Sequence, residues 1–280
     1  MHGLIAGVLR RTIEIALEED LGRGDLTTEA CIDPQSQGRA RIVARQALVF
    51  CGGPVVDEVF RQVDPRVQVT CLVTDGSEVK SGAAVAELAG PSQSLLMGER
   101  VALNYVQRMS ATATLTHSYV KALPEGCSTR ITDTRKTTPG LRALERYAVR
   151  CGGGHNHRED LGAAVLIKDN HIAAAGSIGE AIARAKARSP HTARVTCEVD
   201  TLEQLAQALE AKADVVMLDN FDDENTKRGI TMAKGRALVE ASGGIAKQRV
   251  HTLALMGVDI ISVGALTHSA GSVDLGLDWL

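Results

Sequence analysis

The sequence predicts an α/β protein in which an N-terminal open α/β sandwich domain precedes a C-terminal incomplete (β/α) barrel of the TIM type. From residue 127 onward, short apolar runs alternate with amphipathic helical patterns, which is typical of parallel βαβ units. About six such runs occur, fewer than the eight strands of a complete barrel. A doubly wound open sheet is the alternative, but the first run is followed by TRKTTPG and not by a Gly-rich dinucleotide fingerprint, which favours the barrel.

The composition allows two domains and excludes nucleic acid as a partner. A chain of 280 residues with 44% hydrophobic content can form one large core or two smaller ones. We expect an N-terminal domain over residues 1–110, joined by the C-terminal tail 270–280, and a barrel domain with the active site over 111–269. The net charge is −3 and aromatic residues make up 2%, so neither a basic surface nor a base-stacking platform is predicted.

The cysteines and the N-terminus indicate a reducing compartment and no membrane contact. Six cysteines occur without a C-x-x-C pair, which favours isolated reduced thiols over a disulfide framework. Leu9, Ile13 and Leu17 recur at helical spacing between charged residues, so an amphipathic helix is predicted there and not a signal peptide. No run approaches the roughly 18 apolar residues that a membrane span needs. We therefore expect a cytoplasmic protein.

The N-terminal half is predicted to mix helices and strands. Residues 1–30 have a helical pattern that becomes turn-rich at DLGRGDLT. Turns at Asp75-Gly76 and Ser81-Gly82 predict a hairpin similar to those of lipoyl and biotinyl carriers. The following run, AGPSQSLL, offers no modifiable lysine at a turn tip, so a β-sandwich element is favoured over a carrier domain. The other expected elements are a strand over 39–50, a helix over 51–63, a strand over 67–73 and a long helix over about 95–123.

Every apolar run of the C-terminal half ends in polar, charged or glycine residues. Because the carboxyl ends of parallel strands share one edge of a barrel, where active sites form, we expect a site at this edge. The runs are STRITDT, AAVLIKD, ARVTCEVD, ADVVMLDN, RALVEASG and VDIISVGA, and the helical patterns between them are LRALERYAV, SIGEAIARAKARS, LEQLAQALEA, DENTKRGITMAKG and AKQRVHTLALMG. The run ends are Thr134-Arg135-Lys136, Lys168-Asp169-Asn170, Glu198 with Asp200, Asp219-Asn220, Ser242-Gly243-Gly244 and Gly264-Ala265.

These side chains predict a site for a strongly anionic substrate. Arginine binds carboxylates through its fork of N–H donors, and lysine supplies a point charge. Glycines at the last two run ends are typical of loops that bind a phosphate through backbone N–H groups. The carboxylates of Glu198 and Asp219 suit ribose hydroxyls, Mg²⁺ or acid–base catalysis. The candidate cations are Arg135, Lys136, Arg158 and Lys168, and the candidate glycines are Gly243, Gly244 and Gly264.

Each of these residues also has a purely structural interpretation. Arg135 and Lys136 precede Thr138-Pro139, which has the pattern of a helix start. In this interpretation the two residues are solvated charges in the loop before the helix. The other structural interpretations are a strand-end charge for Lys168, a helix cap for Asp219, a lysine partner for Glu198 and a tight turn for Ser242-Gly243-Gly244. Their convergence on one edge favours the functional interpretation.

The chain resembles the quinolinate phosphoribosyltransferase family over nearly its whole length. The longest matching stretch, DTRKTTPGLRALERYAVRCGGGHNHR over 133–158, is specific to that family. The other matching stretches are ALEEDLGRGDLT, GERVALNYVQRMS, LIKDNHI, EVDTLEQL, VVMLDNF, EASGGI and DIISVGALTHSA, in family order. The resemblance implies transfer of phosphoribose from phosphoribosyl pyrophosphate (PRPP) to quinolinate, with Mg²⁺, giving nicotinate mononucleotide, CO₂ and pyrophosphate in NAD biosynthesis.

The resemblance also implies a role for each site residue. Catalysis falls to Lys136, Glu198 and Asp219, of which the two carboxylates meet the ribose hydroxyls and Mg²⁺, itself held mainly through substrate. The family pattern implies a homodimer or a higher even oligomer in which Arg100 enters the site of the other subunit. The carboxylates of quinolinate are held by Arg135, His157, Arg158 and Lys168, with Thr134 beside them, and the 5′-phosphate is held by Ser242, Gly243, Gly244, Val263, Gly264 and Ala265.

Residues 151–160, CGGGHNHRED, combine three glycines with two histidines spaced i, i+2. No strand precedes this stretch and no Lys-Ser/Thr pair follows it, so it is not a phosphate loop. We expect a carboxylate-binding loop in which the glycines let the backbone approach the ligand and His155 packs within the loop. Departures from the family pattern occur at Glu159-Asp160 and at Ala111-Thr112.

Three rival functions remain for the residues at this edge. A metal-dependent hydrolase barrel would use an H-x-H pair, although such a pair ends an apolar strand and this one follows a helical pattern. A Schiff-base aldolase would use Lys168 as its nucleophile. A phosphometabolite-binding protein would bind PRPP without reaction. The ligands of the hydrolase would be His155, His157, Lys168, His171 and Asp219.

Overall fold

The structure, a computed structural model that describes residues 4–280, contains two compact units with separate cores. The first unit comprises residues 4–117, 137–153 and 266–280, and the second comprises 118–136 and 154–265. The sequence-based boundary near residue 110 stays a prediction. Residues 137–153, which the sequence assigned to the barrel domain, belong to the first compact unit.

The first unit is built on an antiparallel sheet with strand order β12-β1-β5-β3. The C-terminal tail supplies an edge of this sheet, because Ala40 of β1 pairs with Trp279 of β12. The strands of the unit are β1 (Gln37–Ala44), β2 (Leu48–Val49), β3 (Gln68–Cys71), β4 (Glu78–Val79), β5 (Ala84–Pro91) and β12 (Leu275–Trp279). The helices are α1 (Ala6–Leu21), α2 (Leu26–Cys31), α3 (Gly53–Val63), α5 (Arg142–Cys151), most of α4 (Ser92–Val120) and nearly all of α11 (Ala265–His268).

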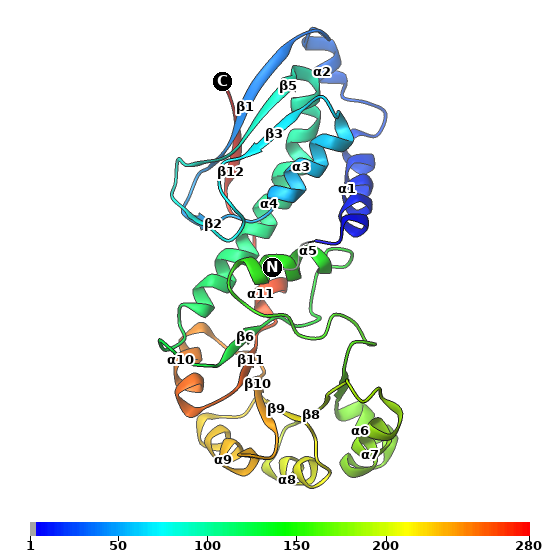
Figure 1. The fold of residues 1–280 in the computed structure, drawn as a ribbon, viewed down its shortest axis with the longest axis vertical. Coiled ribbons are helices and arrows are strands. Elements are labelled where there is room, and N and C mark those ends of the chain that lie inside the picture. The colour runs from blue at the N-terminus through cyan, green and yellow to red at the C-terminus, as the bar shows by residue number, and fades with distance from the viewer. Residues whose placement is uncertain (1–3) are drawn as a thin grey trace. The chain divides into compact units, whose positions relative to one another are not determined.

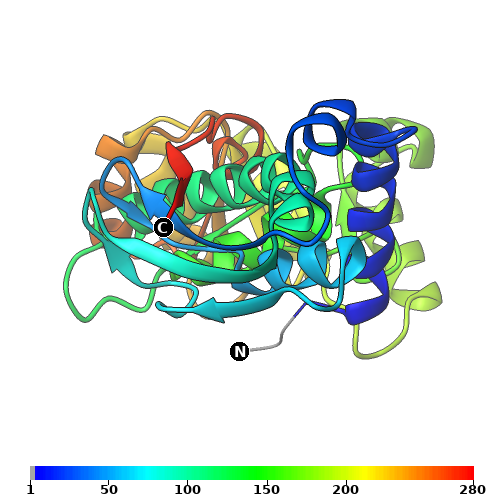
Figure 2. The ribbon, with the colours of Figure 1, turned by 90° about the horizontal axis from the view of Figure 1, so that it is seen from above.

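The predicted strand over 39–50 is wrong as a single element. It divides into β1 and β2 because the pairing of β1 with β5 shifts register after Ile42, and the backbone N–H of Arg45 donates to Asp274 and not to β5. The N-terminal helix is confirmed for the described residues: Leu9, Ile13 and Leu17 are buried on one face of α1. That face contacts α3, beside which α1 runs in Figure 2.

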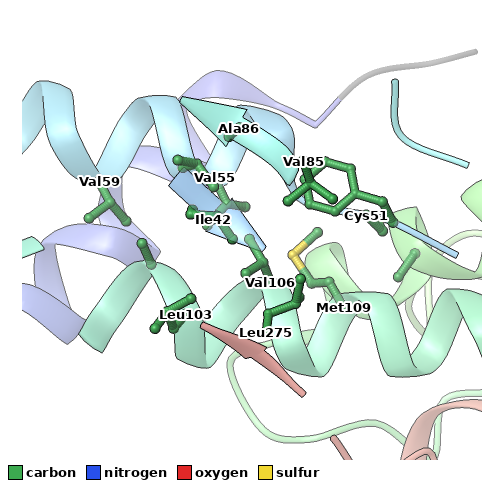
Figure 3. Packing of buried hydrophobic residues seen from close by; sticks show 14 of the residues in the cluster. Ile42, Cys51, Val55, Val59, Val85, Ala86, Leu103, Val106, Met109 and Leu275 are labelled. Atoms are coloured by element: carbon green, nitrogen blue, oxygen red, sulfur yellow. The ribbon is translucent and has the colours of Figure 1, made fainter. Parts of the chain in front are cut away.

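The core of the first unit joins the sheet to α3 and α4, as Figure 3 shows. Ile42 and Ala86 extend from paired strands toward Val59 of α3 and Leu103 of α4. Apolar residues recur along α4 at helical spacing, which explains why one 29-residue helix forms where the sequence predicted a long helix.

The second unit is a parallel six-stranded sheet with order β6-β11-β10-β9-β8-β7, which confirms the predicted βαβ repeat. Helices α6 to α10 follow one another in contact and cover the outer side of the strands (Figure 1). The strands are β6 (Arg130–Thr132), β7 (Val165–Ile167), β8 (Val195–Val199), β9 (Val215–Asp219), β10 (Leu238–Ser242) and β11 (Ile260–Ser262). The helices are α6 (Asp169–Ala175), α7 (Ile178–Arg188), α8 (Leu202–Glu210), α9 (Asp223–Ala233) and α10 (Lys247–Met256).

The strand order is that of a barrel with one seam left open. Strand β6 pairs with β11, the last strand of the unit, but does not pair with β7. The free edge of β6 is taken by His155, whose N–H donates to Ile131 O at 2.8 Å and whose carbonyl accepts from Asp133 N at 3.2 Å. His155 therefore acts through its backbone, as an isolated parallel bridge to Thr132.

The glycines before His155 are required where the chain turns toward β6. A Cβ on Gly152 would lie 2.4 Å from the carbonyl oxygen of Ala113, closer than real side chains come. Gly153 has φ of 87°, a left-handed conformation that glycine adopts without steric cost. The glycine run therefore serves close packing at the end of α5.

Candidate active site

A cavity of about 320 Å³ opens at the carboxyl ends of the parallel strands of the second unit. All six strands, or the residues directly after them, contribute to its wall. The lining residues are Thr134, Arg135, Lys136, His157, Arg158, Leu166, Lys168, Glu198, Met217, Asp219, Glu240, Ser242 and Ser262. The structure thus brings together nine of the residues predicted from the run ends and from the GGGHNHR stretch: Thr134, Arg135, Lys136, His157, Arg158, Lys168, Glu198, Asp219 and Ser242.

Lys168 and Glu198 form an ion pair inside this cavity. They follow or end the neighbouring strands β7 and β8, and Lys168 Nζ donates to Glu198 Oε2. The Lys168 side chain remains 43% exposed and Glu198 only 16%, so the lysine can turn to a ligand while the carboxylate stays in the wall. The pair therefore places one exposed cation and one half-buried carboxylate in the same wall of the cavity.

His157 is held on three sides. Its backbone N–H donates to Asp133 Oδ1 at 2.7 Å, and Asp133 is fully buried. Its Nδ1 accepts from the backbone N–H of Arg158 at 2.8 Å, which leaves the proton of the neutral ring on Nε2. Nε2 lies 3.4 Å from Glu240 Oε1. These contacts fix the direction of the ring at the cavity wall.

Arg158 enters the cavity without an acidic partner. Among residues 4–280, its guanidinium has one hydrogen bond, from Nη1 to Ala164 O at 3.0 Å. Burial and the charge of Arg135 lower the pKa of the Arg158 guanidinium from its usual value. A half-buried cation beside a second cation, with no carboxylate to neutralise it, is suited to an anionic ligand.

Glu240 is a cavity residue that sequence reasoning missed. It is 2% exposed, accepts a hydrogen bond from the Ser262 hydroxyl and faces His157. The available signal was its position two residues before Ser242 on the same strand, because alternate residues of a strand share a face. An acidic residue inside an apolar run, on the strand face predicted to meet the ligand, is therefore a candidate site residue.

Of the structural alternatives, two do not occur and one does. Asp222, not Asp219, caps α9 by accepting from Asn225 N. Thr138 does not begin α5, because its N–H and hydroxyl both donate to the buried carboxylate of Glu145, and that helix starts at Arg142. The lysine partner foreseen for Glu198 is present as Lys168.

The residues predicted to hold a phosphate come directly after cavity-lining residues in the sequence but do not line the cavity themselves. Gly243 has φ of 90°, and a Cβ there would lie 2.6 Å from Asn220 N, so this turn requires glycine. The N–H of Val263 already donates to Thr132 O at 2.9 Å. The five residues of this group are Gly243, Gly244, Val263, Gly264 and Ala265, and they come directly after Ser242 or Ser262, which do line the cavity.

The remaining predicted residues lie elsewhere. Arg100 is an exposed residue of α4 in the first unit, and its contribution to another subunit stays a prediction. Glu159 and Asp160 are exposed, and Asp160 Oδ1 accepts from Gly162 N at 2.8 Å within its own loop. Neither lines the cavity, and Ala111-Thr112 is buried in α4.

Three further features bear on the alternatives. A larger groove of about 630 Å³ on the outer side of β7 is lined mainly by apolar and basic residues and contains no carboxylate, so the strand-end cavity is the better site for a sugar. Among the described residues, His155, His157 and His171 do not gather into a metal-binding cluster. Within that same range, no helix is long and apolar enough to cross a bilayer.

The fold and the site define a class of protein: a two-domain α/β enzyme with a cationic cavity at the carboxyl ends of an open ring of parallel strands. Sequence profiles of one family match nearly the whole chain. The quinolinate phosphoribosyl transferase N-terminal domain matches residues 25–110, and the C-terminal domain of the same family matches residues 112–278. The chain belongs to the quinolinate phosphoribosyl transferase family, which confirms the resemblance found in the sequence.

Similar proteins agree with this assignment. The chain is 43% identical over 270 residues to the probable nicotinate-nucleotide pyrophosphorylase [carboxylating] of Bacillus subtilis, covering 96% of this chain and 93% of the relative. It is 42% identical to the Mycobacterium leprae enzyme, covering 96% of each. The solved structure of the nicotinate-nucleotide pyrophosphorylase from Francisella tularensis superposes with a TM-score of 0.93 at 39% identity, covering 99% of this chain and 98% of the other.

Proposed function

We propose that the protein transfers phosphoribose from PRPP to quinolinate and releases nicotinate mononucleotide, CO₂ and pyrophosphate. The observation that carries this proposal is Arg158, a half-buried cation without an acidic partner among residues 4–280, set in a cavity with further cations and three carboxylates. A pyridine dicarboxylate and a polyphosphorylated sugar together need that combination of charges. Nearly full-length similarity to carboxylating nicotinate-nucleotide pyrophosphorylases supports the same reaction.

Quinolinate binds at the cationic side of the cavity. Arg158 and Arg135 supply forked donors that match a carboxylate, and the Nε2–H of His157 adds a third donor. Lys168 leaves Glu198 to meet the second carboxylate. The two carboxylates of the ligand replace water around these cations and provide the counter-charge that residues 4–280 do not supply at Arg158.

PRPP binds at the side formed by β8 to β11. Once Lys168 has moved, Glu198 and Asp219 accept hydrogen bonds from the ribose hydroxyls. The 5′-phosphate lies against Ser242 and the glycine turn after it, with Gly264 and Ala265 completing that end. The backbone of Val263 contributes shape and no donor, since its N–H is already used by Thr132.

A divalent cation fits the acidic side of the cavity. Glu198 and Asp219 both line it, and Mg²⁺ prefers carboxylate oxygens together with substrate phosphates. Bound Mg²⁺ supplies positive charge that stabilises the departing pyrophosphate. We propose these two carboxylates as its protein contacts.

The reaction needs charge stabilisation more than proton transfer. The bond from ribose C1 to pyrophosphate lengthens first, and Lys136 neutralises the charge that develops on the leaving group. Glu198 and Asp219 face the positive charge that develops on the ribose ring. The pyridine nitrogen then forms its bond to C1. Its new positive charge stabilises the electron pair that departing CO₂ leaves on the neighbouring ring carbon, and this carbon takes a proton from solvent to give nicotinate mononucleotide.

The assembly and location of the protein are part of the same proposal. We propose a homodimer or a higher even oligomer in which Arg100 on α4 adds a cation to the site of another subunit. We propose a cytoplasmic location on the basis of the unpaired cysteines in the sequence.

Incubation of the protein with quinolinate, PRPP and Mg²⁺ tests the function. We expect nicotinate mononucleotide and CO₂ in equal amounts, and product that depends on each of the three components. A folded protein that binds PRPP but forms no product is a phosphometabolite-binding protein, and the proposal is then wrong. Borohydride trapping of a keto substrate on Lys168 would support the aldolase in its place.

A further inference from the structure

Two buried thiols and a carboxylate meet in the first unit. Cys51 lies just before α3, Cys151 ends α5, and Asp75 lies in the turn before β4. One sulfur or carboxylate oxygen of each residue lies within 4.8 Å of those of the other two. The cysteines are about 100 positions apart in the sequence, so only the fold brings them together. None of the three lines the candidate active site.

The two thiols lie close to each other. Both are free cysteines, and their sulfur atoms lie within 4.8 Å of each other. Cys51 is fully buried and packs in the core that Figure 3 shows, whereas Cys151 retains 6% of its surface. A disulfide needs its sulfur atoms about 2.05 Å apart, so the two sulfur atoms must move closer together before a bond can form. A small oxidant reaches Cys151 first.

The surroundings make the two thiols chemically unequal. The neighbouring Cys51 thiol lowers the pKa of the Cys151 thiol, and the Tyr147 hydroxyl and the Arg150 charge act in the same direction, against burial and the charge of Asp75. Burial raises the pKa of the Cys51 thiol well above its usual value. Because the thiolate is the nucleophile, Cys151 reacts first and Cys51 is the second, resolving thiol.

The carboxylate of Asp75 already accepts hydrogen bonds from the backbone and from Tyr147. Its Oδ1 accepts from Gly52 N at 3.1 Å and from Gly53 N at 3.0 Å, and its Oδ2 accepts from the Tyr147 hydroxyl at 2.8 Å. Three of its roughly four acceptor positions are therefore in use. The cluster is better suited to chemistry between the two thiols than to binding a metal ion through all three residues.

We propose that Cys51 and Cys151 form a peroxide-reactive thiol pair that closes into a disulfide. The Cys151 thiolate attacks one oxygen of hydrogen peroxide, the O–O bond breaks, and hydroxide leaves, which makes Cys151 a sulfenic acid. The sulfur of Cys51 then attacks the sulfur of Cys151, the S–O bond breaks, and the departing hydroxide takes the proton of Cys51 to form water. Two thiols are oxidised to one disulfide, and one peroxide is reduced to two waters.

The bond would join the end of α5 to the start of α3. It would close a loop of about 100 residues, and such a cross-link stabilises a protein mainly by restricting the unfolded chain. The proposed thiol pair does not depend on the proposed transferase reaction, since neither cysteine lines the active-site cavity.

Peptide mapping after peroxide treatment of the full-length protein tests the proposal. We expect a cross-linked peptide pair containing Cys51 and Cys151, the loss of two hydrogen atoms from the intact mass, and a midpoint of thermal unfolding several degrees higher. Dithiothreitol reverses all three changes. Recovery of both residues as free thiols, under conditions that oxidise the exposed Cys31 and Cys71, would overturn the proposal.

Single substitutions separate the two steps. In Cys51→Ser, Cys151 stops at the sulfenic acid, which dimedone labels, whereas in the wild type dimedone labelling at Cys151 is weak because Cys51 resolves it. Cys71→Ser is the matched control and still forms the 51–151 bond. The absence of dimedone label on Cys151 in folded Cys51→Ser, or a bond from Cys151 to Cys71, contradicts the proposed order of reaction.

Discussion

Replacing Arg158 with alanine removes a cation that no described carboxylate neutralises. Its one hydrogen bond within the described chain goes to the carbonyl of Ala164, so the substitution leaves no buried acid unpaired. A forked contact to a ligand carboxylate contains two charge-assisted hydrogen bonds, each contributing about 1.5–3 kcal/mol. The combined loss of about 3–6 kcal/mol corresponds to a rise in the KM for quinolinate of roughly 10²–10⁴-fold. Arg158→Lys keeps the charge without the fork, and we expect a smaller rise of about tenfold.

Steady-state rates against quinolinate, together with calorimetric titration of PRPP, measure this effect. We expect the affinity for PRPP to stay within about twofold of the wild type, since that substrate lies on the other side of the cavity. Arg184→Ala is the matched control, because Arg184 is an exposed arginine of α7 that pairs with Glu180 outside the cavity. An unchanged KM for quinolinate, or an equal loss of both substrates, would refute the assignment of Arg158 to carboxylate binding.

Three further substitutions test other parts of the second and first units. Glu240→Ala removes the buried carboxylate that accepts from the Ser262 hydroxyl and lies 3.4 Å from His157 Nε2, so the free energy of unfolding, measured in urea, should fall by about 1–3 kcal/mol. Glu240→Gln should recover most of it. Gly243→Ala forces a left-handed conformation and a clash, so the KM for PRPP should rise at least tenfold while the KM for quinolinate changes little. In the first unit, Arg66 lowers the pKa of the Asp64 carboxyl, with burial opposing. Because the folded pKa lies below the unfolded one, the ionised carboxylate stabilises the fold above about pH 4, and this stabilisation is lost as the pH falls. Asp64→Asn should therefore lower the unfolding free energy by about 1–2 kcal/mol at pH 7 and by less at pH 2.

Much of the second unit follows from local sequence patterns. The six apolar runs became six parallel strands, and because parallel strands end at one edge, the residues that follow them had to meet. Lys168, Glu198 and Asp219 were found for this reason alone. Glu240 was missed because the prediction used only the residues at the run ends, whereas a strand also presents the residue two positions earlier.

The non-local features could not be derived in this way. Helix α5 has an ordinary amphipathic pattern, and nothing in it indicates that Leu144 and Tyr147 pack in the core of the first unit. The contact between Cys51 and Cys151 depends on that same placement. His155 was predicted to pack within its loop. In the structure its backbone forms hydrogen bonds to the free edge of β6, which the chemistry of its side chain does not reveal.

The open seam between β6 and β7 has a consequence for the ligand itself. Arg158 follows the segment that lies along the free edge of β6, and its Nη1 donates to the carbonyl of Ala164, the residue directly before β7. One side chain thus links two strand edges that the backbone leaves unjoined. A ligand carboxylate that binds Arg158 would hold this side chain in place, so ligand binding would also stabilise the connection between β6 and β7.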